Sequence, residues 1–142
     1  MKVLLDSNVL FSGLGFIGNE NKVIWLAVLG RIKLVVSDYI LLESRKNIEK
    51  KFTGDRQKDA LEVLERLIIS EALQVKRKEK YLVHLEDARA LINEKDSPIL
   101  ACAMLEDIDI LITGDRSFHT KKVKDRIRVM GAGEFLERYT SA

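Results

Sequence analysis

The sequence has very little cysteine and proline, and each scarcity excludes a class of protein. A single cysteine, Cys102, among 142 residues rules out an internal disulfide framework and a zinc site built from cysteines alone. One proline and eight glycines leave little room for low-complexity segments or long flexible linkers. We therefore expect one small domain in the reducing cytoplasm, large enough to bury a core without disulfides or a structural metal. Cys102 and Trp25 are expected to pack in that core.

Long apolar runs and a strong excess of one charge are missing as well. No apolar stretch approaches the ~18 residues of a membrane span. Lys2 and Asp6 place charges at the start of the chain, so we expect no secretory signal segment. The 24 Lys and Arg residues nearly balance the 22 Asp and Glu residues, giving a formal net charge of +2. That balance permits nucleic-acid binding without requiring it.

Short apolar runs alternate with longer helical patterns along the chain. Unbroken apolar runs, typical of strands buried on both faces of a parallel sheet, occupy residues 3–5, 34–36 and 110–112. Residues 73–75 alternate as an edge strand does, and residues 127–130 are a candidate fifth strand. Helical periodicity marks residues 23–29, 39–52, 60–68, 85–92 and 97–104. This alternation predicts an α/β fold, a three-layer αβα sandwich around a mostly parallel sheet of four to five strands.

Acidic residues lie close to the predicted strand ends. Ligands of such folds bind at the carboxyl ends of the strands, so the topology brings several carboxylates toward one edge of the sheet. Crowded carboxylates raise one another's pKa and oppose folding unless a cation lies among them. Oxygen ligands without histidine or cysteine suit Mg²⁺ or Mn²⁺ rather than zinc. The residues concerned are Asp6, Asp38, Glu43, Asp96 and Asp115.

Four sequence blocks resemble, in order and spacing, those of PIN-domain nucleases across about residues 1–130. They are DSNVL at 6–10, SDYILLE at 37–43, KDSPILACA at 95–103 and LITGDRSF at 111–118. Each block alone is loose, whereas four in order are fairly specific. The resemblance implies a single PIN-like domain over residues 1–142, with a C-terminal helix to the end. A lone domain of this size is similar to the VapC-type toxins and their stand-alone relatives.

The resemblance also implies an activity and a site. Asp6, Glu43, Asp96 and Asp115 would hold one or two Mg²⁺ or Mn²⁺ ions, and Asn8 and Thr113 would support them. The implied activity is endoribonuclease cleavage of RNA phosphodiester bonds by a metal-activated water, in a toxin–antitoxin pair or in RNA processing. The implied partners are single-stranded RNA, a separate antitoxin protein and a second copy of the chain in a homodimer.

Two further features bear on that site. Ser117 stands where many members of the family have another acid, which would weaken a second metal position. Basic side chains near Asp115 would contact RNA phosphates and make binding salt-dependent, although such runs are more often only a solvated face. The side chains concerned are Arg116, Lys121, Lys122 and Lys124.

Each acid also has an ordinary structural explanation when taken alone. Asp96 at a helix start is a normal capping residue, as is Asn8, and Asp115 after Gly114 is normal turn chemistry. Helical periodicity places Glu43 away from the apolar stripe of its helix and so predicts a solvated side chain. Only the four acids taken together support a site. An inactive PIN-like domain that binds RNA without cleaving it is an alternative hypothesis.

A dinucleotide-binding site is the competing hypothesis. Gly13, Gly15 and Gly18 fit the Rossmann pattern G-x-G-x-x-G, and Asp38 follows Gly18 by 20 residues. The pattern requires its first glycine directly after the first strand, yet seven residues separate Leu5 from Gly13. We therefore expect these glycines to form a mobile loop beside the acids instead.

Overall fold

The computed structural model describes residues 1–140, which form a five-stranded parallel sheet between two layers of helices. The strand order is β3-β2-β1-β4-β5. The strands are β1 (Lys2–Leu5), β2 (Lys33–Ser37), β3 (Leu73–Lys76), β4 (Ile110–Ile112) and β5 (Val129–Met130). The predicted α/β sandwich is confirmed, with the alternating strand at one edge and the fifth strand at the other.

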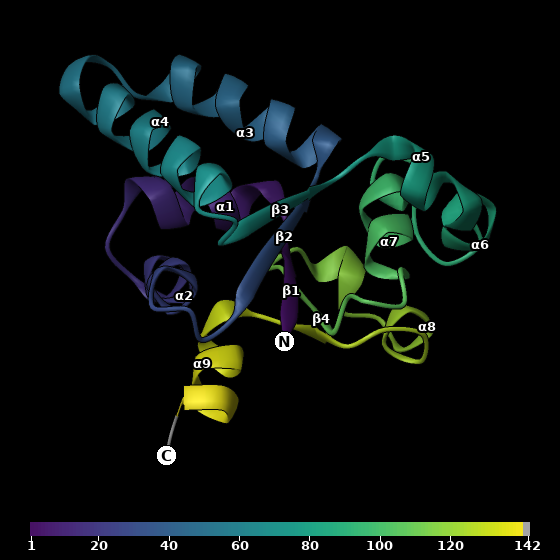
Figure 1. Cartoon of the computed structure of the whole chain (residues 1–142). Helices are drawn as coiled ribbons and strands as arrows, with labels where there is room; N and C mark the ends of the chain where they lie inside the picture. The colour runs from purple at the N-terminus through teal and green to yellow at the C-terminus, as the bar shows by residue number, and fades with distance from the viewer. Residues whose placement is uncertain (141–142) are drawn as a thin grey trace.

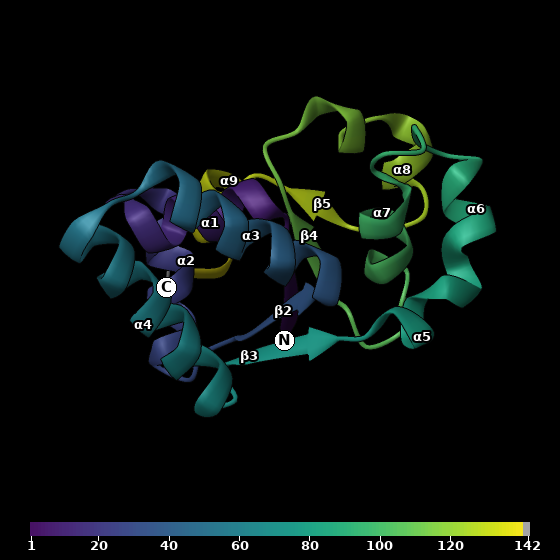
Figure 2. The ribbon, with the colours of Figure 1, turned by 90° about the horizontal axis from the view of Figure 1, so that it is seen from above.

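The helices divide between the two faces of the sheet, as Figures 1 and 2 show. One layer contains α1 (Ser7–Gly15), α2 (Asn19–Val28), α3 (Asp38–Lys51), α4 (Gly54–Ile69) and α9 (Ala132–Thr140). The other contains α5 (Lys78–Tyr81), the 3₁₀ turn η1 (Leu82–His84), α6 (Leu85–Arg89), α7 (Ser97–Ala103) and α8 (Lys121–Lys124). A second 3₁₀ turn, η2 (Arg116–Phe118), follows β4. The apolar side chains of the central strands are buried between these layers, with at most 1% of their surface exposed.

Local sequence signals explain where several helices begin and end. The Ser37 hydroxyl accepts a hydrogen bond from the Ile40 amide at 3.0 Å and so caps α3. Gly30 follows α2 with a φ of +75°, a left-handed conformation that glycine adopts without a steric penalty. Pro98 lies in the first turn of α7, where its missing N–H is not needed.

The glycine segment differs from the sequence prediction. Gly13 and Gly15 lie within α1, which begins directly after Asp6, so no glycine loop follows β1. A Cβ on Gly13 would come within 2.7 Å of the Ile24 side chain, and one on Gly15 within 2.2 Å of the Phe52 ring. These glycines therefore allow close helix packing, and the structure gives no support to a pyrophosphate loop.

Smaller predictions have mixed outcomes. Cys102 is buried as expected, whereas Trp25 is 56% exposed, because it lies on the outer side of α2. The helix expected over 85–92 ends earlier, at Arg89. The helix predicted at the end of the chain spans Ala132–Thr140, and residues 141–142 lie outside the described part. Within residues 1–140, no helix has the length and apolar character needed to cross a bilayer.

Candidate active site

The strand order places the carboxyl ends of β1 and β4 side by side at the centre of the sheet. The Asp6 amide, directly after β1, donates to the Ile112 carbonyl at the end of β4 (3.2 Å). The chain runs outward from β1 to β2 and β3 and then returns to add β4 and β5 on the other side. The ends of β1 and β4 therefore form the switch point where ligands of open parallel sheets bind.

All four predicted acids line one cavity at this switch point. The cavity has a volume of about 150 Å³, and Asp6, Glu43, Asp96 and Asp115 reach it from four separate parts of the chain. Asn8, the predicted supporting residue, lines it as well. The remaining lining residues are Ser7, Tyr39, Asn47, Lys95 and Ile99.

Asp6 is the most enclosed of the four acids, with 5% of its surface exposed. Its Oδ2 accepts a hydrogen bond from the buried Thr113 hydroxyl (2.7 Å), and its Oδ1 accepts one from Ser7 (3.3 Å). Burial raises the pKa of Asp6 above 3.8, and the charge of Asp115 adds to that rise. Thr113 also accepts the Asp115 amide at 3.0 Å, so this threonine orients two of the acids.

A serine connects the other two aspartates. The Ser117 Oγ lies 2.9 Å from Oδ2 of Asp96 and 2.9 Å from Oδ1 of Asp115. One hydroxyl proton can serve only one of these carboxylates at a time. The Asn93 side chain donates a further hydrogen bond to Oδ2 of Asp96 at 2.8 Å. Neutral donors thus hold the two carboxylates close together.

Glu43 belongs to the cavity through its position on α3. It lies one turn from Tyr39 and one turn from Asn47, so the three side chains share a helix face. The Tyr39 hydroxyl donates to Oε2 of Glu43 (3.3 Å), and the charge of Glu43 raises the pKa of Tyr39. The solvated side chain that periodicity predicted is therefore wrong: Glu43 is half-buried. Because α3 starts where β2 ends, its first turns stand beside the strand ends rather than over solvent.

Helix capping does not account for these acids. Asp6 and Asp96 occupy the N-cap positions of α1 and α7, yet neither side chain makes a capping hydrogen bond. Asn8 is inside α1 and exposed, so it is not the cap. Asp115 does accept the Ser117 amide (3.0 Å), as a turn aspartate would. Two of the four carboxylates therefore have no capping role that would explain their position.

Comparison with known families decides which group of proteins this geometry belongs to. A model of the PIN domain matches residues 2–117, which include all four cavity acids. The chain belongs to the PIN-domain family. Proteins with this domain are generally nucleases, which are hydrolases and typically depend on divalent metal ions.

Solved structures show the same PIN fold. The chain is similar to one in the crystal structure of VapBC2 from Rickettsia felis bound to a DNA fragment from its promoter, with 17% identity and a TM-score of 0.67. It is also similar to one in FitAcB from Neisseria gonorrhoeae, with 22% identity and a TM-score of 0.65. Each alignment covers 92% of this chain and 98% of the other. A search of curated proteins finds no match.

The donor set of this PIN domain fits a hard divalent cation. Its acids offer only carboxylate oxygens, the ligands that Mg²⁺ and Mn²⁺ prefer. Within residues 1–140, the buried Asp6 carboxylate has hydroxyl partners and forms no ion pair with a basic side chain. Among residues 1–140, no three acidic, histidine or cysteine side chains are already arranged closely enough to hold an ion. Binding of one ion by three or more of these acids would therefore require their carboxylates to move closer together.

Five residues that line the cavity escaped the sequence prediction: Ser7, Tyr39, Asn47, Lys95 and Ile99. Tyr39 and Asn47 lie four residues before and after Glu43 on the same helix. Once Glu43 is assigned to the cavity, this spacing identifies both of them. Lys95 precedes Asp96 and supplies the positive side chain of the cavity lining. An exposed lysine carries no sequence signal for such a role.

The basic residues predicted to bind RNA lie outside the cavity. Arg116 is exposed in η2, directly after Asp115. Lys121, Lys122 and Lys124 are exposed on α8, where Lys121 forms an ion pair with Asp125 (3.0 Å). None of the four lines the acid cavity, so they would contact a nucleic acid only beyond the reacting centre.

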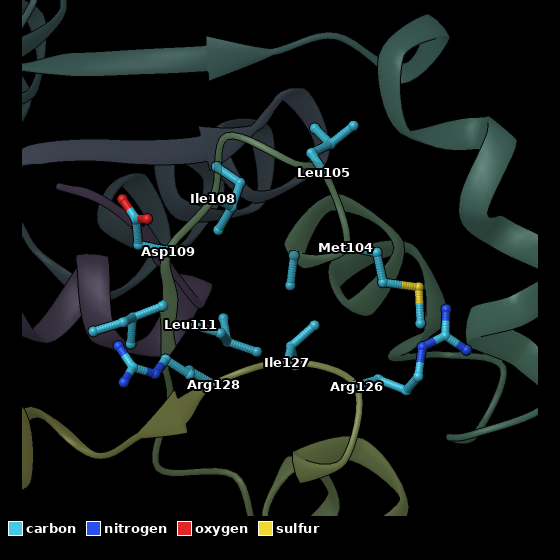
Figure 3. Close-up of a pocket in the computed structure, with 10 residues that line it drawn as sticks. Met104, Leu105, Ile108, Asp109, Leu111, Arg126, Ile127 and Arg128 are labelled. Carbon is cyan, nitrogen blue, oxygen red and sulfur yellow. The ribbon is translucent and has the colours of Figure 1, made fainter.

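A larger hollow lies at the opposite end of β4 and is separate from the acids. It has a volume of about 260 Å³ and is lined by apolar side chains such as Met104, Ile108 and Ile127, together with Arg126 and Arg128 (Figure 3). Because this hollow is at the amino end of the strand, it is not part of the PIN active site.

Proposed function

We propose that this PIN domain is a Mg²⁺- or Mn²⁺-dependent endoribonuclease. The observation that supports this proposal is the convergence of Asp6, Glu43, Asp96 and Asp115 on one cavity at the switch point of the sheet. Carboxylates that line one cavity repel one another, most of all where one of them is buried, and a hard divalent cation between them would relieve that repulsion.

The roles of the residues follow from their positions. Asp6, Glu43, Asp96 and Asp115 hold one or two ions, Thr113 orients Asp6, and Asn8 supports the site from the first turn of α1. A divalent ion held there would supply polarisation of a phosphoryl oxygen and would lower the pKa of water toward neutrality. No histidine lines the cavity, so the residues lining it offer no serine–histidine pair as an alternative nucleophile.

Substrate and partners are part of the same proposal. Single-stranded RNA approaches along Arg116, Lys121, Lys122 and Lys124, which bind its phosphates. The fold shared with chains of VapBC2 and FitAcB supports a toxin with a separate antitoxin protein as its partner. A homodimer and a cytoplasmic location belong to the same proposal.

The test is cleavage of single-stranded RNA by purified protein in Mn²⁺ and in EDTA. We expect cleavage only with metal, and a loss on the order of 100-fold or more in Asp6→Asn and in Asp96→Asn. Asp59→Asn, an exposed aspartate on α4, is the matched control and should cleave normally. Metal-free Asp6→Asn should be at least as stable as the wild type, because it removes a buried charge whose pKa is raised.

Other outcomes would contradict the proposal in different ways. A fully active Asp96→Asn enzyme would remove Asp96 from the mechanism. RNA binding without any cleavage in Mn²⁺ would instead favour an inactive RNA-binding module. A rise in the melting temperature of metal-free protein with NAD(P) or FAD, but none with Mn²⁺, would favour a dinucleotide site.

A further inference from the structure

A second hollow lies next to the acid cavity, and the proposed function does not use it. It has a volume of about 510 Å³, within the range of roughly 300–1,000 Å³ that small-molecule sites occupy. Its lining is mostly apolar and comes from α3, α5, η1, α6 and α7. The α6 residue Arg89 also lines it and is held in ion pairs with Glu86 and Glu94. Leu42 and Leu82 on its walls are 54% and 43% exposed, which is unusual for leucine side chains gathered at one place.

Tyr39 forms the wall between this hollow and the acid cavity, since it lines both. Its hydroxyl donates to Glu43, a proposed metal ligand, so the polar end of the side chain is held at the acids. Tyr39 as a whole residue remains 44% exposed. An exposed aromatic ring directly beside a phosphate-cleaving centre is placed where a base flanking that phosphate would lie.

The polar groups around the hollow also distinguish it from a general polar pocket. Asp38 is fully engaged within the protein, because its carboxylate accepts the Tyr81 hydroxyl (2.6 Å) and the Lys78 amide (2.8 Å). The Lys78 side chain, in contrast, is exposed and forms no ion pair within residues 1–140. A free cation at the rim of an apolar hollow is complementary to a nucleotide, which joins a flat apolar base to a phosphate.

We infer that the hollow beside Tyr39 binds the nucleobase next to the cleaved phosphate, with the base stacked on Tyr39 and packed against Leu42 while Lys78 contacts an adjacent phosphate. This inference rests on the proposed ribonuclease function and extends it to a second binding subsite. Stacking accepts every base, so the subsite adds affinity and register more than sequence specificity.

The experiment measures binding of two fluorescein-labelled octamers in EDTA, where no cleavage occurs: octaadenylate and an abasic ribose-phosphate octamer of the same charge. We expect Tyr39→Ala to weaken octaadenylate binding roughly tenfold and to leave binding of the abasic octamer unchanged. Tyr39→Phe keeps the ring and should bind both as the wild type does. Lys78→Ala should weaken both octamers equally and lower the salt dependence of binding by about one ion.

Leu42→Ala and Leu29→Ala form a matched pair, since both truncate exposed leucines but only Leu42 lines the hollow. Leu42→Ala should weaken octaadenylate binding and Leu29→Ala should not. Equal losses on both octamers in Tyr39→Ala, or none, would overturn the inference. A shift of Tyr39→Ala or Leu42→Ala to a smaller oligomer in analytical ultracentrifugation would overturn it too, because the face would then be a contact between copies of the chain.

The outcomes separate this inference from the nuclease proposal. Metal-dependent cleavage without base-dependent binding at Tyr39 leaves the nuclease proposal intact and overturns the subsite. Base-dependent binding at Tyr39 with no cleavage in Mn²⁺ supports the subsite and contradicts the nuclease.

Discussion

Ser117 shows how much one side chain can determine about a metal site. By the sequence resemblance it is expected to stand where many PIN domains have another acid, and its hydroxyl lies within hydrogen-bond distance of both Asp96 and Asp115. A neutral donor between two carboxylates reduces their repulsion, whereas a third carboxylate would increase it. The serine therefore lets the protein keep these acids together without metal, and it leaves fewer oxygen ligands for a second ion.

Replacing this serine with the acid tests that explanation. Ser117→Asp should lower the stability of the metal-free protein by roughly 1 kcal/mol or more, because three carboxylates then share one site. Mn²⁺ should raise the melting temperature of Ser117→Asp more than that of the wild type, by mass action on a stronger site. Thermal unfolding with EDTA and with Mn²⁺ measures both effects. Ser117→Asn is the neutral control. If Ser117→Asn lost as much stability as Ser117→Asp, the cause would be the shape of the new side chain rather than its charge.

At the scale of elements, α1 carries its glycines for packing rather than for ligand binding. The helix crosses α2 so closely that a Cβ on Gly13 would lie 2.7 Å from the Ile24 side chain and 3.0 Å from the Glu20 carbonyl oxygen. Sequence patterns cannot distinguish this use of glycine from a phosphate loop, because both need the absence of a side chain. Only the neighbouring helix shows which applies.

The variant Gly13→Ala separates the two effects of glycine in a helix. Alanine is favoured over glycine in a helix by about 1 kcal/mol, but overpacking costs about 1–3 kcal/mol. Because the clash includes backbone of α2, we expect overpacking to outweigh the helix preference, with a net loss of up to roughly 2 kcal/mol in denaturant unfolding. Ser12→Ala, on the same helix, should be neutral or slightly stabilising. A Gly13→Ala protein more stable than the wild type would contradict the close packing of α1 on α2.

At the scale of the whole molecule, Asp107 connects distant parts of the sheet. Its Oδ2 lies 2.6 Å from the Lys76 ammonium at the end of β3 and 2.9 Å from the Lys2 ammonium at the start of β1. The hydrogen bond from Lys76, and then that from Lys2, lowers the pKa of Asp107 to about 2. The residue lies away from the acid cavity, so its charge contributes to folding rather than to the site.

The pH dependence of stability follows from that shift. Because the pKa of Asp107 in the folded protein lies below its ordinary 3.8, its charge stabilises the fold above about pH 4. The contribution is lost as pH falls from about 4 to about 2. Asp107→Asn should therefore destabilise the protein at pH 7 by roughly 1 kcal/mol or less, since solvent screens this 40% exposed carboxylate. Urea unfolding measured from pH 7 to pH 3 should show the difference in free energy of unfolding between the wild type and Asp107→Asn becoming smaller. A difference that does not change with pH would contradict the stabilising role of the Asp107 charge.

The sequence predicted the central strands best, because their apolar residues are buried. Val3, Leu4 and Leu5 have no exposed surface, and such positions leave an unbroken apolar run that can be recognised without a structure. Glu43 illustrates the opposite case. Its helix shows an apolar stripe that faces the core, and periodicity has no means of telling a face turned to solvent from one turned to a cavity.

The sequence by itself was sufficient to predict the α/β class, the parallel strands and the four acids. Buried strands leave apolar runs in the sequence, and the motifs that contain the acids have a recognisable order and spacing. The tertiary structure alone decided that Tyr39, Asn47 and Lys95 join those acids, and that Ser117 connects two of them. The physical reason is that carboxylates and hydroxyls interact over a few ångströms in space. Which of them meet depends on the order of the strands and on the start of each helix, and residue spacing does not encode either directly.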